Sequence, residues 1–428
     1  MSRLLRLIAE TGGQNAMIVD SSALPEQVVQ DVLASGFDSA GQRCSALRVL
    51  CLQQDIAERT LRMLKAAMQE LRIGDPASLA TDIGPVIDEA ARDRLLAHID
   101  AMRRRGRPVH QLPLPAGCGP GCFVPPTLIE IDSLTELTQE VFGPVVHVLR
   151  FAGDELPALL DAINATGYGL TLGLHSRIDE TVDAVSAQAH VGNLYVNRNM
   201  VGAVVGVQPF GGEGLSGTGP KAGGPLYLPL LAGCAEVLPA ALPAEVAAAN
   251  AVLQEYAAWA RKWGYRALAG HCDTYAAQSL LGVKQVLPGP TGERNTLTFA
   301  PRGRLFCRAG GVETLLAQLA AVFATGNTAA LADDAAGREV LALLPPALAA
   351  RVALRAADDF TGIAGVLLDA DDPALCRRLA AADGPLIAVY RPAGEGGRYP
   401  LYRMLAERVV SINTTAAGGN TTLMTLGA

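Results

Sequence analysis

The sequence is poor in charged residues and has no long uninterrupted apolar run. Charged side chains make up 18% of its 428 residues, and no apolar stretch approaches the roughly 20 residues that a membrane-spanning helix needs. A basic block, or a face of interleaved basic and aromatic residues, is also lacking, which argues against nucleic-acid binding. Half of the residues are hydrophobic and the net charge is −7. The composition therefore predicts a folded acidic protein that can bury two or three cores.

Closely spaced cysteine pairs are lacking as well. The eight cysteines are scattered along the chain, which is typical of a reducing compartment, so we expect a cytoplasmic protein. The nearest two, Cys118 and Cys122, have no second Cys or His pair beside them, and we predict a loop there and no metal site. Residues 1–8 are too short for a signal peptide and lack a small-residue cleavage site.

Alternating strand and helix patterns predict an α/β fold built on a parallel sheet with helices on both faces. The expected elements of the first part are strands at residues 4–9, 145–151, 170–174 and 193–197, helices at residues 25–34, 89–105 and 155–166, and a long helix capped by Asp55. Proline and alanine dominate residues 228–243, after which a helix from residue 244 and a second strand–helix alternation follow. We therefore predict one domain at residues 1–228, a linker at 229–244 and a second domain at 245–428.

A short motif occurs twice. Residues 192–197 end in Asn and are followed by Gly202, and residues 408–413 end in Asn and are followed by Gly418 at the same offset. Both copies end a helix–strand unit in the predicted order of elements. The repeat suggests a duplicated fold whose second copy has lost its working residues.

Cys44 is the candidate nucleophile. It follows a Gly-Gln-Arg turn and precedes a strand-like run at residues 47–52. Backbone N–H groups that point outward in such a turn lower a thiol pKa, and the thiolate is the reactive form. The ordinary alternative is a small buried apolar residue, and that is what we predict for Cys51 within the run.

Two glutamates are candidates for roles beside Cys44. Glu10, at the end of the predicted strand 4–9, would lie at the carboxyl end of the sheet and could activate a water molecule. Glu140 could accept hydrogen bonds from ribose hydroxyls, with the ring of Phe142 packing against a nicotinamide. The alternatives are a surface glutamate at a strand end and a loop glutamate before Gly-Pro. A glycine-rich loop at residues 210–225 has backbone N–H groups that could converge on an anion.

The order and separation of residues 8–17, 37–45, 139–144 and 209–212 resemble the catalytic domain of the aldehyde dehydrogenase superfamily. Residues 8–17 and the loop at 212–225 resemble more closely the bifunctional proline utilization A family, which joins proline dehydrogenase to L-glutamate γ-semialdehyde dehydrogenase. The resemblance implies that Cys44 attacks the aldehyde to form a thiohemiacetal and that its backbone N–H helps to hold the oxyanion. Hydride would pass to NAD, and Glu10 would activate the water that releases glutamate.

The resemblance also implies roles for further residues. Cofactor-binding residues would be Glu140, Phe142, Thr11 and Gly12. The substrate carboxylate would be held by Ser45, Gly202 and Ala203, and Phe210 would line the aldehyde tunnel. The partners implied are the aldehyde substrate, upstream cofactor and proline dehydrogenase domains, of which the latter holds FAD, and further copies in a homo-oligomer. The parent protein could associate with a membrane.

The sequence also departs from the family. The cofactor domain would precede residue 1, and residues 292–303 and 323–331 resemble only pieces of it, with Asp333 close to where a lysine motif would follow. We therefore interpret residues 245–428 as a degenerate aldehyde dehydrogenase-like Rossmann domain that packs without catalysing. We expect this chain alone to have little or no dehydrogenase activity and not to hold NAD firmly, because acidic residues repel phosphates.

Two other functions stay open from the residues alone. Cys44 and Glu10 could acylate and deacylate without a cofactor, as a thiol esterase. A purely structural or assembly module is the second alternative, with a hairpin at residues 193–207 and the tail at 408–428 pairing sheet edges between subunits.

Overall fold

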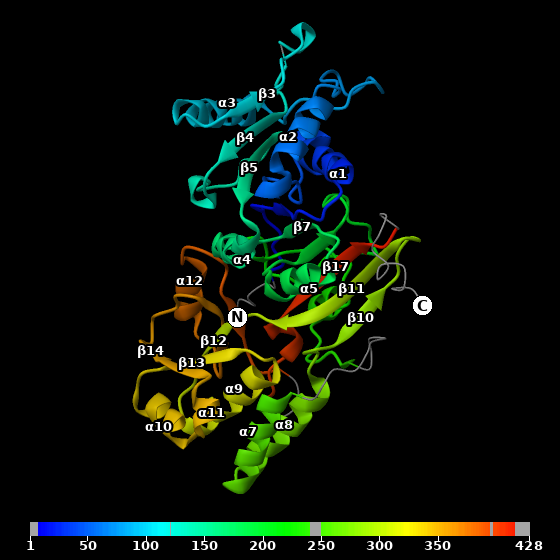
Figure 1. Ribbon diagram of the computed structural model, residues 1–428. Coiled ribbons are helices and arrows are strands. Elements are labelled where there is room, and N and C mark those ends of the chain that lie inside the picture. Colours follow the sequence, from blue (N-terminus) through cyan, green and yellow to red (C-terminus); the bar gives the residue numbers. More distant parts are fainter. Residues whose placement is uncertain (1–6, 120, 240–249, 394–396, 416–428) are drawn as a thin grey trace. The chain divides into compact units, whose positions relative to one another are not determined.

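The computed structural model describes residues 7–119, 121–239, 250–393 and 397–415. Their contacts divide them into two compact units (Figure 1). The larger unit contains residues 10–217 and 288–295 and the described residues from 410 onward, and the smaller unit contains the others. The division falls at residues 217 and 218, ahead of the predicted domain boundary at 228, and the predicted domain assignment stays a prediction. None of the described helices is both long enough and apolar enough to cross a membrane.

A mainly parallel sheet forms the core of the larger unit. Its order is β8-β7-β1-β2-β5-β4-β3, and every neighbouring pair in this order is parallel except β3 with β4. The strands are β1 (Ala16–Val19), β2 (Val49–Gln53), β3 (Val109–Gln111), β4 (Thr127–Ile131), β5 (Val145–Phe151), β7 (Thr171–His175) and β8 (Asn193–Val196). The central strands β1, β2, β5, β7 and β8 are almost fully buried, as apolar runs covered on both faces of a parallel sheet should be. The predicted α/β class is confirmed.

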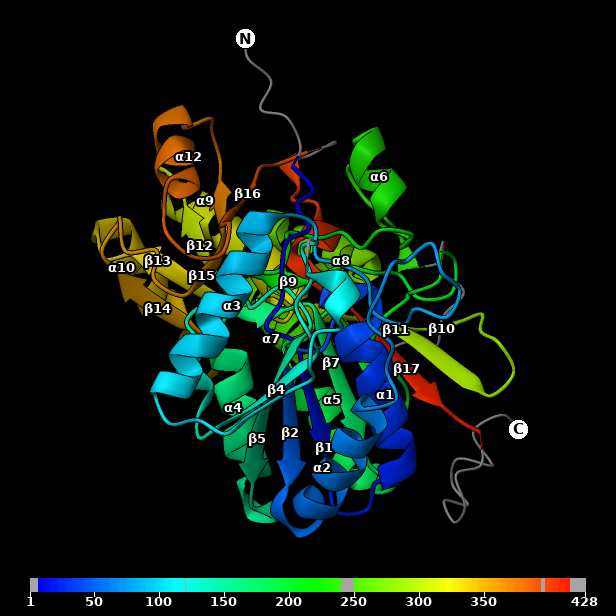
Figure 2. The same ribbon diagram turned by 90° about the horizontal axis from the view of Figure 1, so that it is seen from above.

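Helices cover the sheet of the larger unit. They are α1 (Pro25–Phe37), α2 (Gln54–Met68), α3 (Glu89–Arg104), α4 (Leu156–Ala165) and α5 (Asp179–Gln188). Figures 1 and 2 show α1 next to α2, and both helices contact β5. Pro25 occupies the first helical turn, where its missing N–H costs nothing. Asp55 lies in the first turn of α2 and is not its cap, because Gln53 occupies the cap position. A two-stranded ribbon pairs β6 (Tyr168–Gly169) with β9 (Glu213–Gly214).

Three late strands extend the same sheet beyond β8. The order at that side is β10 (Lys284–Leu287), β11 (Glu293–Pro301), β17 (Leu405–Asn413) and then β8. The Asn413 side-chain amide donates to the carbonyl oxygen of Asn197 at 3.0 Å. The two copies of the repeated motif therefore lie on adjacent strands of one sheet. The interpretation of the repeat as a duplicated fold stays a prediction.

The smaller unit has a five-stranded parallel sheet of order β14-β13-β12-β15-β16. Its strands are β12 (Arg304–Arg308), β13 (Thr328–Ala332), β14 (Val352–Arg355), β15 (Ile363–Leu368) and β16 (Ala388–Tyr390), and its helices are α6 (Tyr227–Ala232), α7 (Ala251–Lys262), α8 (Arg266–Gln278), α9 (Val312–Ala324), α10 (Ala335–Leu343), α11 (Pro346–Ala349) and α12 (Pro373–Ala380). In chain order the strands read 3-2-1-4-5, the order of a Rossmann-type sheet.

Most predicted elements are present, with three corrections. The strand predicted at residues 4–9 is wrong, because residues 7–9 are not in a strand and Glu10 makes only an isolated bridge with Gly217; residues 4–6 lie outside the described part. The hairpin predicted at 193–207 is wrong, because no strand follows β8 before β9. The helix expected from residue 244 begins at Ala251 in the described chain, where the Asn250 side chain accepts from Leu253 N.

Candidate active site

A strained turn presents Cys44 to solvent. After α1 the chain forms a short 3-10 helix, η1 (Asp38–Gly41), in which Ser39, Ala40 and Gly41 have φ values of 56°, 53° and 66°. Such left-handed conformations cost energy in residues with a side chain and persist only where the surroundings fix them. At Gly41 a Cβ atom would meet the carbonyl oxygen of Gly143 at 2.2 Å, so only glycine fits. Cys44 follows three residues later and is exposed.

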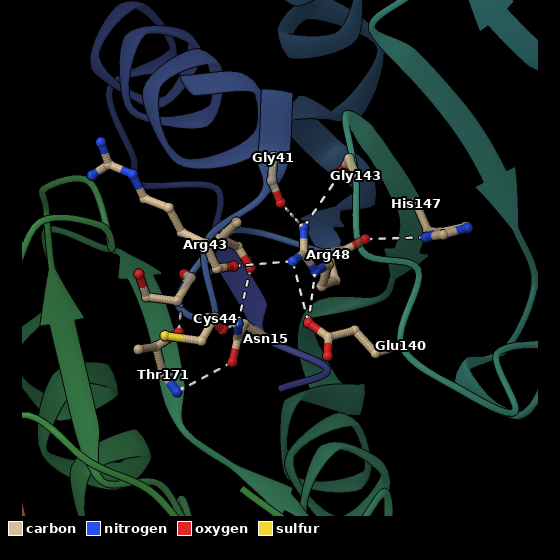
Figure 3. A network of polar contacts seen from close by, with 11 residues as sticks. Asn15, Gly41, Arg43, Cys44, Arg48, Glu140, Gly143, His147 and Thr171 are labelled. Carbon is tan, nitrogen blue, oxygen red and sulfur yellow. Dashed lines mark hydrogen bonds and ion pairs between the residues drawn. The ribbon is translucent and has the colours of Figure 1, made fainter. Parts of the chain in front are cut away.

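Asn15 holds the nucleophile from the other side (Figure 3). Its side-chain amide donates to the carbonyl oxygens of Cys44, at 2.6 Å, and Ala46, at 2.9 Å. Its side-chain oxygen accepts from the backbone N–H of Thr171 at 3.3 Å. Asn15 directly precedes β1 and Thr171 begins β7. The site therefore lies at the amino ends of the parallel strands, and the prediction that it lies at their carboxyl ends is wrong.

The surroundings raise the pKa of the Cys44 thiol above its ordinary value. Burial is the largest cause; the backbone N–H groups of Ser45 and of Cys44 itself act in the opposite direction, and the carboxylates of Glu10 and Glu140 raise the pKa further. The predicted lowering by the turn is thus outweighed. Both carboxylates therefore interact electrostatically with the thiol.

Glu10 interacts electrostatically with Cys44. Its carboxylate accepts from the backbone N–H of Gly212 at 3.3 Å and raises the pKa of the thiol. The Glu10 side chain is exposed. Within the loop at residues 210–217, the Ser216 hydroxyl accepts from Gly169 N at 3.0 Å.

Glu140 forms an ion pair with a residue that the sequence did not single out. Its Oε1 accepts from Nε and Nη2 of Arg48, each at 3.2 Å, and the Arg48 side chain is fully buried. Burial raises the pKa of Glu140, whereas Arg48 and the backbone N–H of Gly13 lower it. A Cβ at Gly12 would lie 1.9 Å from Glu140 Oε2, so the carboxylate needs glycine there. The sequence feature that could have indicated this ion pair is an arginine inside the apolar run at 47–52, because a buried guanidinium requires partners.

The other predicted cofactor residues separate into two groups. The Arg48 guanidinium lies 4.8 Å from the centre of the Phe142 ring, and that ring is exposed. Phe142, Glu140 and Gly12 are therefore brought together. Thr11 faces another segment: its hydroxyl donates to Leu215 O at 2.6 Å.

The predicted substrate residues come from the turn of Cys44 and from the segment at residues 202–210. Ser45 is buried, and its carbonyl oxygen accepts from the Thr171 hydroxyl at 3.2 Å. Gly202 has a φ of 76° and is exposed; a Cβ there would be 3.8 Å from Arg43 Nη1. Ala203 and Phe210 are half-buried.

The Glu293 carboxylate, which the sequence did not single out for the site, holds the segment containing Gly202. Glu293 accepts hydrogen bonds from the side chains of Arg198 and Gln208, which flank that segment. Gln208 in turn accepts from the backbone N–H of Val204 at 2.9 Å. The segment at residues 198–208 is thus fixed at both ends by one carboxylate.

In the smaller unit, carboxylates lie where a Rossmann-type sheet binds phosphate. Gly310 follows β12 and precedes α9, and its N–H donates to Asp369 Oδ2 at 3.1 Å. Asp333, after β13, pairs with Arg338 at 2.6 Å. A protein carboxylate therefore already uses one of the N–H groups that this turn could offer to an anion.

Comparisons with known proteins agree with this arrangement. Residues 1–230 match the family model described as "Aldehyde dehydrogenase family". The chain is 52% identical over 446 aligned positions to "Bifunctional protein PutA" of Escherichia coli (strain K12), covering 99% of this chain and 34% of that protein. It is 39% identical over 230 positions to "1-pyrroline-5-carboxylate dehydrogenase" of Geobacillus thermodenitrificans (strain NG80-2), covering 53% of this chain and 43% of that protein. The chain thus spans about a third of the length of the first of these relatives.

Among solved structures, proline utilization A (PutA) from Corynebacterium freiburgense is similar to almost the whole chain. The TM-score is 0.71 at 26% identity, and the match covers 95% of this chain and 39% of that one. The likeness therefore extends over both compact units.

Proposed function

The chain belongs to the aldehyde dehydrogenase family, and from this premise we propose that it supplies the nucleophile and the base for NAD-dependent oxidation of L-glutamate γ-semialdehyde to L-glutamate. The observation that carries the proposal is the exposed Cys44 thiol, held in a strained turn and close enough to Glu10 for that carboxylate to affect its pKa. The names of the relatives, a bifunctional PutA and a 1-pyrroline-5-carboxylate dehydrogenase, support this substrate.

In the proposed reaction the Cys44 thiolate attacks the aldehyde carbon and forms a thiohemiacetal. The backbone N–H groups of Cys44 and Ser45 favour the thiolate before attack, and the Cys44 N–H helps to stabilise the oxyanion afterwards. Bound NAD would supply the hydride acceptor, and loss of the hydride from the thiohemiacetal would leave the acyl group on Cys44 as a thioester. Glu10 then takes a proton from water, the water oxygen attacks the acyl carbon, and the thiolate leaves with release of glutamate.

The residues present fit the nicotinamide end of NAD. Glu140 offers carboxylate oxygens that can accept from ribose hydroxyls, and the exposed Phe142 ring offers a face for the nicotinamide. Because Gly12 has no side chain, Glu140 Oε2 can lie against it without a clash. We propose Ser45, Gly202 and Ala203 for the substrate carboxylate and Phe210 for the aldehyde path.

We propose a non-catalytic role for the smaller unit. Its Gly310 N–H already binds a carboxylate, and acidic side chains there repel phosphate. Dehydrogenase activity would then need the family's cofactor domain, with FAD in a proline dehydrogenase domain of the larger protein and a homo-oligomer as its assembly. The cytoplasmic location also stays a prediction.

Protection of Cys44 from alkylation tests the proposal without any need for turnover. The chain is incubated with glutamate semialdehyde, then with iodoacetamide, and each cysteine is quantified by peptide mass spectrometry. We expect slower alkylation of Cys44, no change at the exposed Cys234, and weaker protection by an aldehyde without a carboxylate. Equal alkylation of Cys44 with and without substrate would contradict the proposed nucleophile.

A cofactor-free esterase is the second candidate, favoured by the exposure of both Cys44 and Glu10. Hydrolysis of p-nitrophenyl acetate that disappears in Cys44→Ala and persists in Cys51→Ala would show this activity. NADH formation by the chain alone, at a rate near that of a full-length relative, would contradict our expectation that it lacks dehydrogenase activity.

A further inference from the structure

One buried guanidinium uses all three of its nitrogen atoms within the site (Figure 3). Nη1 of Arg48 donates to the carbonyl oxygen of Gly41 at 2.7 Å and, more weakly, to that of Gly143 at 3.5 Å. Nη2 donates to the carbonyl oxygen of Arg43 at 3.0 Å and to Glu140 Oε1 at 3.2 Å, and Nε donates to the same Oε1 at 3.2 Å. No part of the side chain is exposed.

The acceptors belong to two segments that are far apart in the sequence. Gly41 and Arg43 form the turn before Cys44, whereas Glu140 and Gly143 belong to the loop before β5, more than 90 residues later. The turn is the strained part of the backbone, so its conformation requires an external anchor. Arg48 supplies that anchor, and the same cation pairs with the carboxylate proposed to hold the cofactor ribose.

The backbone of Arg48 is itself fixed from β5. Its carbonyl oxygen accepts from the backbone N–H of His147 at 2.8 Å, and His147 Nδ1 lies 3.2 Å from it. Burial lowers the pKa of His147 to about 3, so this imidazole is neutral at ordinary pH. Its Nε2 lies 2.9 Å from His98 Nε2 on α3. The backbone of Arg48 is therefore held in place, and its guanidinium reaches both segments from that fixed position.

We propose that Arg48 is a positioning residue, which joins the turn of Cys44 and the loop of Glu140 and Phe142 into one rigid piece so that the thiol and the cofactor ligands keep a fixed relation. The roles of Glu140 and Phe142 in this statement rest on the proposed function. The link to Cys44 does not need a bound cofactor.

Acylation and alkylation of Cys44 report on different requirements. Acylation by p-nitrophenyl acetate needs the sulfur oriented against the N–H groups that stabilise the oxyanion, whereas alkylation by iodoacetamide needs mainly the thiolate. Arg48→Lys keeps the charge, but its ammonium cannot reproduce the planar fork that serves both segments. In the full 428-residue chain we expect Arg48→Lys to lower the acylation rate by about tenfold or more, while alkylation stays close to wild type.

The pH profile of alkylation separates the charge from the geometry. Arg48→Met removes a cation that interacts favourably with the Cys44 thiolate, so the midpoint should move to higher pH. Glu140→Gln removes a carboxylate that raises the thiol pKa, so its midpoint should move to lower pH. Arg59→Met on α2 is the matched control, because its ion pair with Glu26 is exposed, and it should change neither rate.

The outcomes are separable. If wild-type chain shows no acylation that depends on Cys44, the esterase candidate fails, and unchanged alkylation profiles in Arg48→Met and Glu140→Gln would then overturn this inference. If wild-type chain acylates and Arg48→Lys, folded by circular dichroism, acylates equally fast, Arg48 is not a positioning residue. Where Arg48→Met does not fold, Arg48→Lys decides alone. A selective loss of acylation with retained alkylation supports the inference.

Discussion

The side-chain amide of Asn15 donates to the carbonyl oxygen of Cys44 at 2.6 Å, from a position directly before β1 (Figure 3). The same amide group binds Ala46 O, and its oxygen accepts from Thr171 N. One buried side chain thus ties the nucleophile to the amino ends of two neighbouring strands. The position of the Cys44 backbone therefore depends both on this amide and on the turn that precedes it.

Replacement of Asn15 by alanine should destabilise the larger unit and misplace Cys44. Two carbonyl oxygens and one N–H group would lose their partner, and a buried polar group left unpaired costs about 1–3 kcal/mol. We expect a lower free energy of unfolding in urea and slower acylation of Cys44 by p-nitrophenyl acetate. Thr171→Val, which removes only the hydroxyl that binds Ser45 O, should have the smaller effect on both. Wild-type acylation in Asn15→Ala would contradict this role.

Glu10→Gln should have opposite effects on two measurements. The Glu10 carboxylate raises the pKa of Cys44, so its neutralisation should shift the pH profile of iodoacetamide alkylation to lower pH. Hydrolysis of the acyl group needs a base, so steady-state ester turnover should fall by about 10²-fold or more. A burst of p-nitrophenol followed by slow turnover would identify deacylation as the affected step. If Glu10→Gln slowed both the alkylation of Cys44 and the ester turnover, separate roles for Glu10 and Cys44 would be contradicted.

Much of the fold could be predicted because it depends on local pattern. The buried apolar run of β5 (Val145–Phe151) matches its predicted bounds, and α3 (Glu89–Arg104) ends one residue before its predicted end. In contrast, local pattern could not predict whether the site lies at the amino or the carboxyl ends of the parallel strands. It depends on which end of each strand the loops return to, and that is set by long-range pairing.

The candidate site was predicted unevenly for the same reason. Cys44 and Glu140 stand in recognisable local motifs, but the ion pair of Arg48 with Glu140 joins residues 92 positions apart. Glu293 was interpreted as part of a remnant domain, whereas its carboxylate binds Arg198 and Gln208. Likewise, the pKa of Cys44 could not be derived from the turn alone. Burial and two carboxylates that are far away in the sequence outweigh the N–H groups of the turn.

Gly12→Ala should displace the Glu140 carboxylate. The new Cβ would lie 1.9 Å from Oε2, so Glu140 must move away from Arg48, and the buried guanidinium would lose its counter-charge. We expect a loss of about 3 kcal/mol in the free energy of unfolding, as for a broken buried ion pair. Gly117→Ala is the control, because a Cβ there meets no atom within 4 Å. Equal stability of Gly12→Ala and wild type would show that this packing is not rigid.

His175 should make the fold less stable in acid. Burial lowers its pKa from 6.5 to about 4, so the folded state excludes a proton that the unfolded chain binds. Its unfavourable contribution therefore grows as pH falls from 6.5 to about 4, by about 1.4 kcal/mol per pH unit. Burial also raises the pKa of the neighbouring Asp31 to about 6, which acts in the opposite sense, with stability lost as pH rises towards 6.

His175→Gln isolates the histidine contribution. Glutamine keeps a donor near Asp31 and does not titrate, so the difference in unfolding free energy between wild type and variant should change steadily between pH 6.5 and 4. Asp31 lies 3.3 Å from His175 Nε2 and its titration is coupled to that of the histidine, so both proteins are compared in an Asp31→Asn background. The same substitution at the exposed His190 serves as the control. A difference that is independent of pH would mean that His175 stays neutral in both states or charged in both.

Glu293→Gln should weaken recognition of the substrate carboxylate without harming the nucleophile. The Glu293 carboxylate binds Arg198 and Gln208 at the two ends of the segment that contains Gly202 and Ala203. A neutral amide pairs less strongly with Arg198, so the segment should loosen while the turn before Cys44, which has other partners, keeps its shape.

The protection assay reads this change directly. Glutamate semialdehyde should protect Cys44 of Glu293→Gln from iodoacetamide about tenfold less well than it protects wild type, as expected for a loosened charge-assisted contact worth roughly 1.4 kcal/mol. An aldehyde without a carboxylate should protect both proteins equally, because it gains nothing from Gly202 and Ala203. Glu58→Gln, whose partner Arg150 also binds Glu130, is the surface control. Equal losses with both aldehydes would instead mean that Glu293 supports the nucleophile turn, and the assignment of the segment to the carboxylate would be wrong.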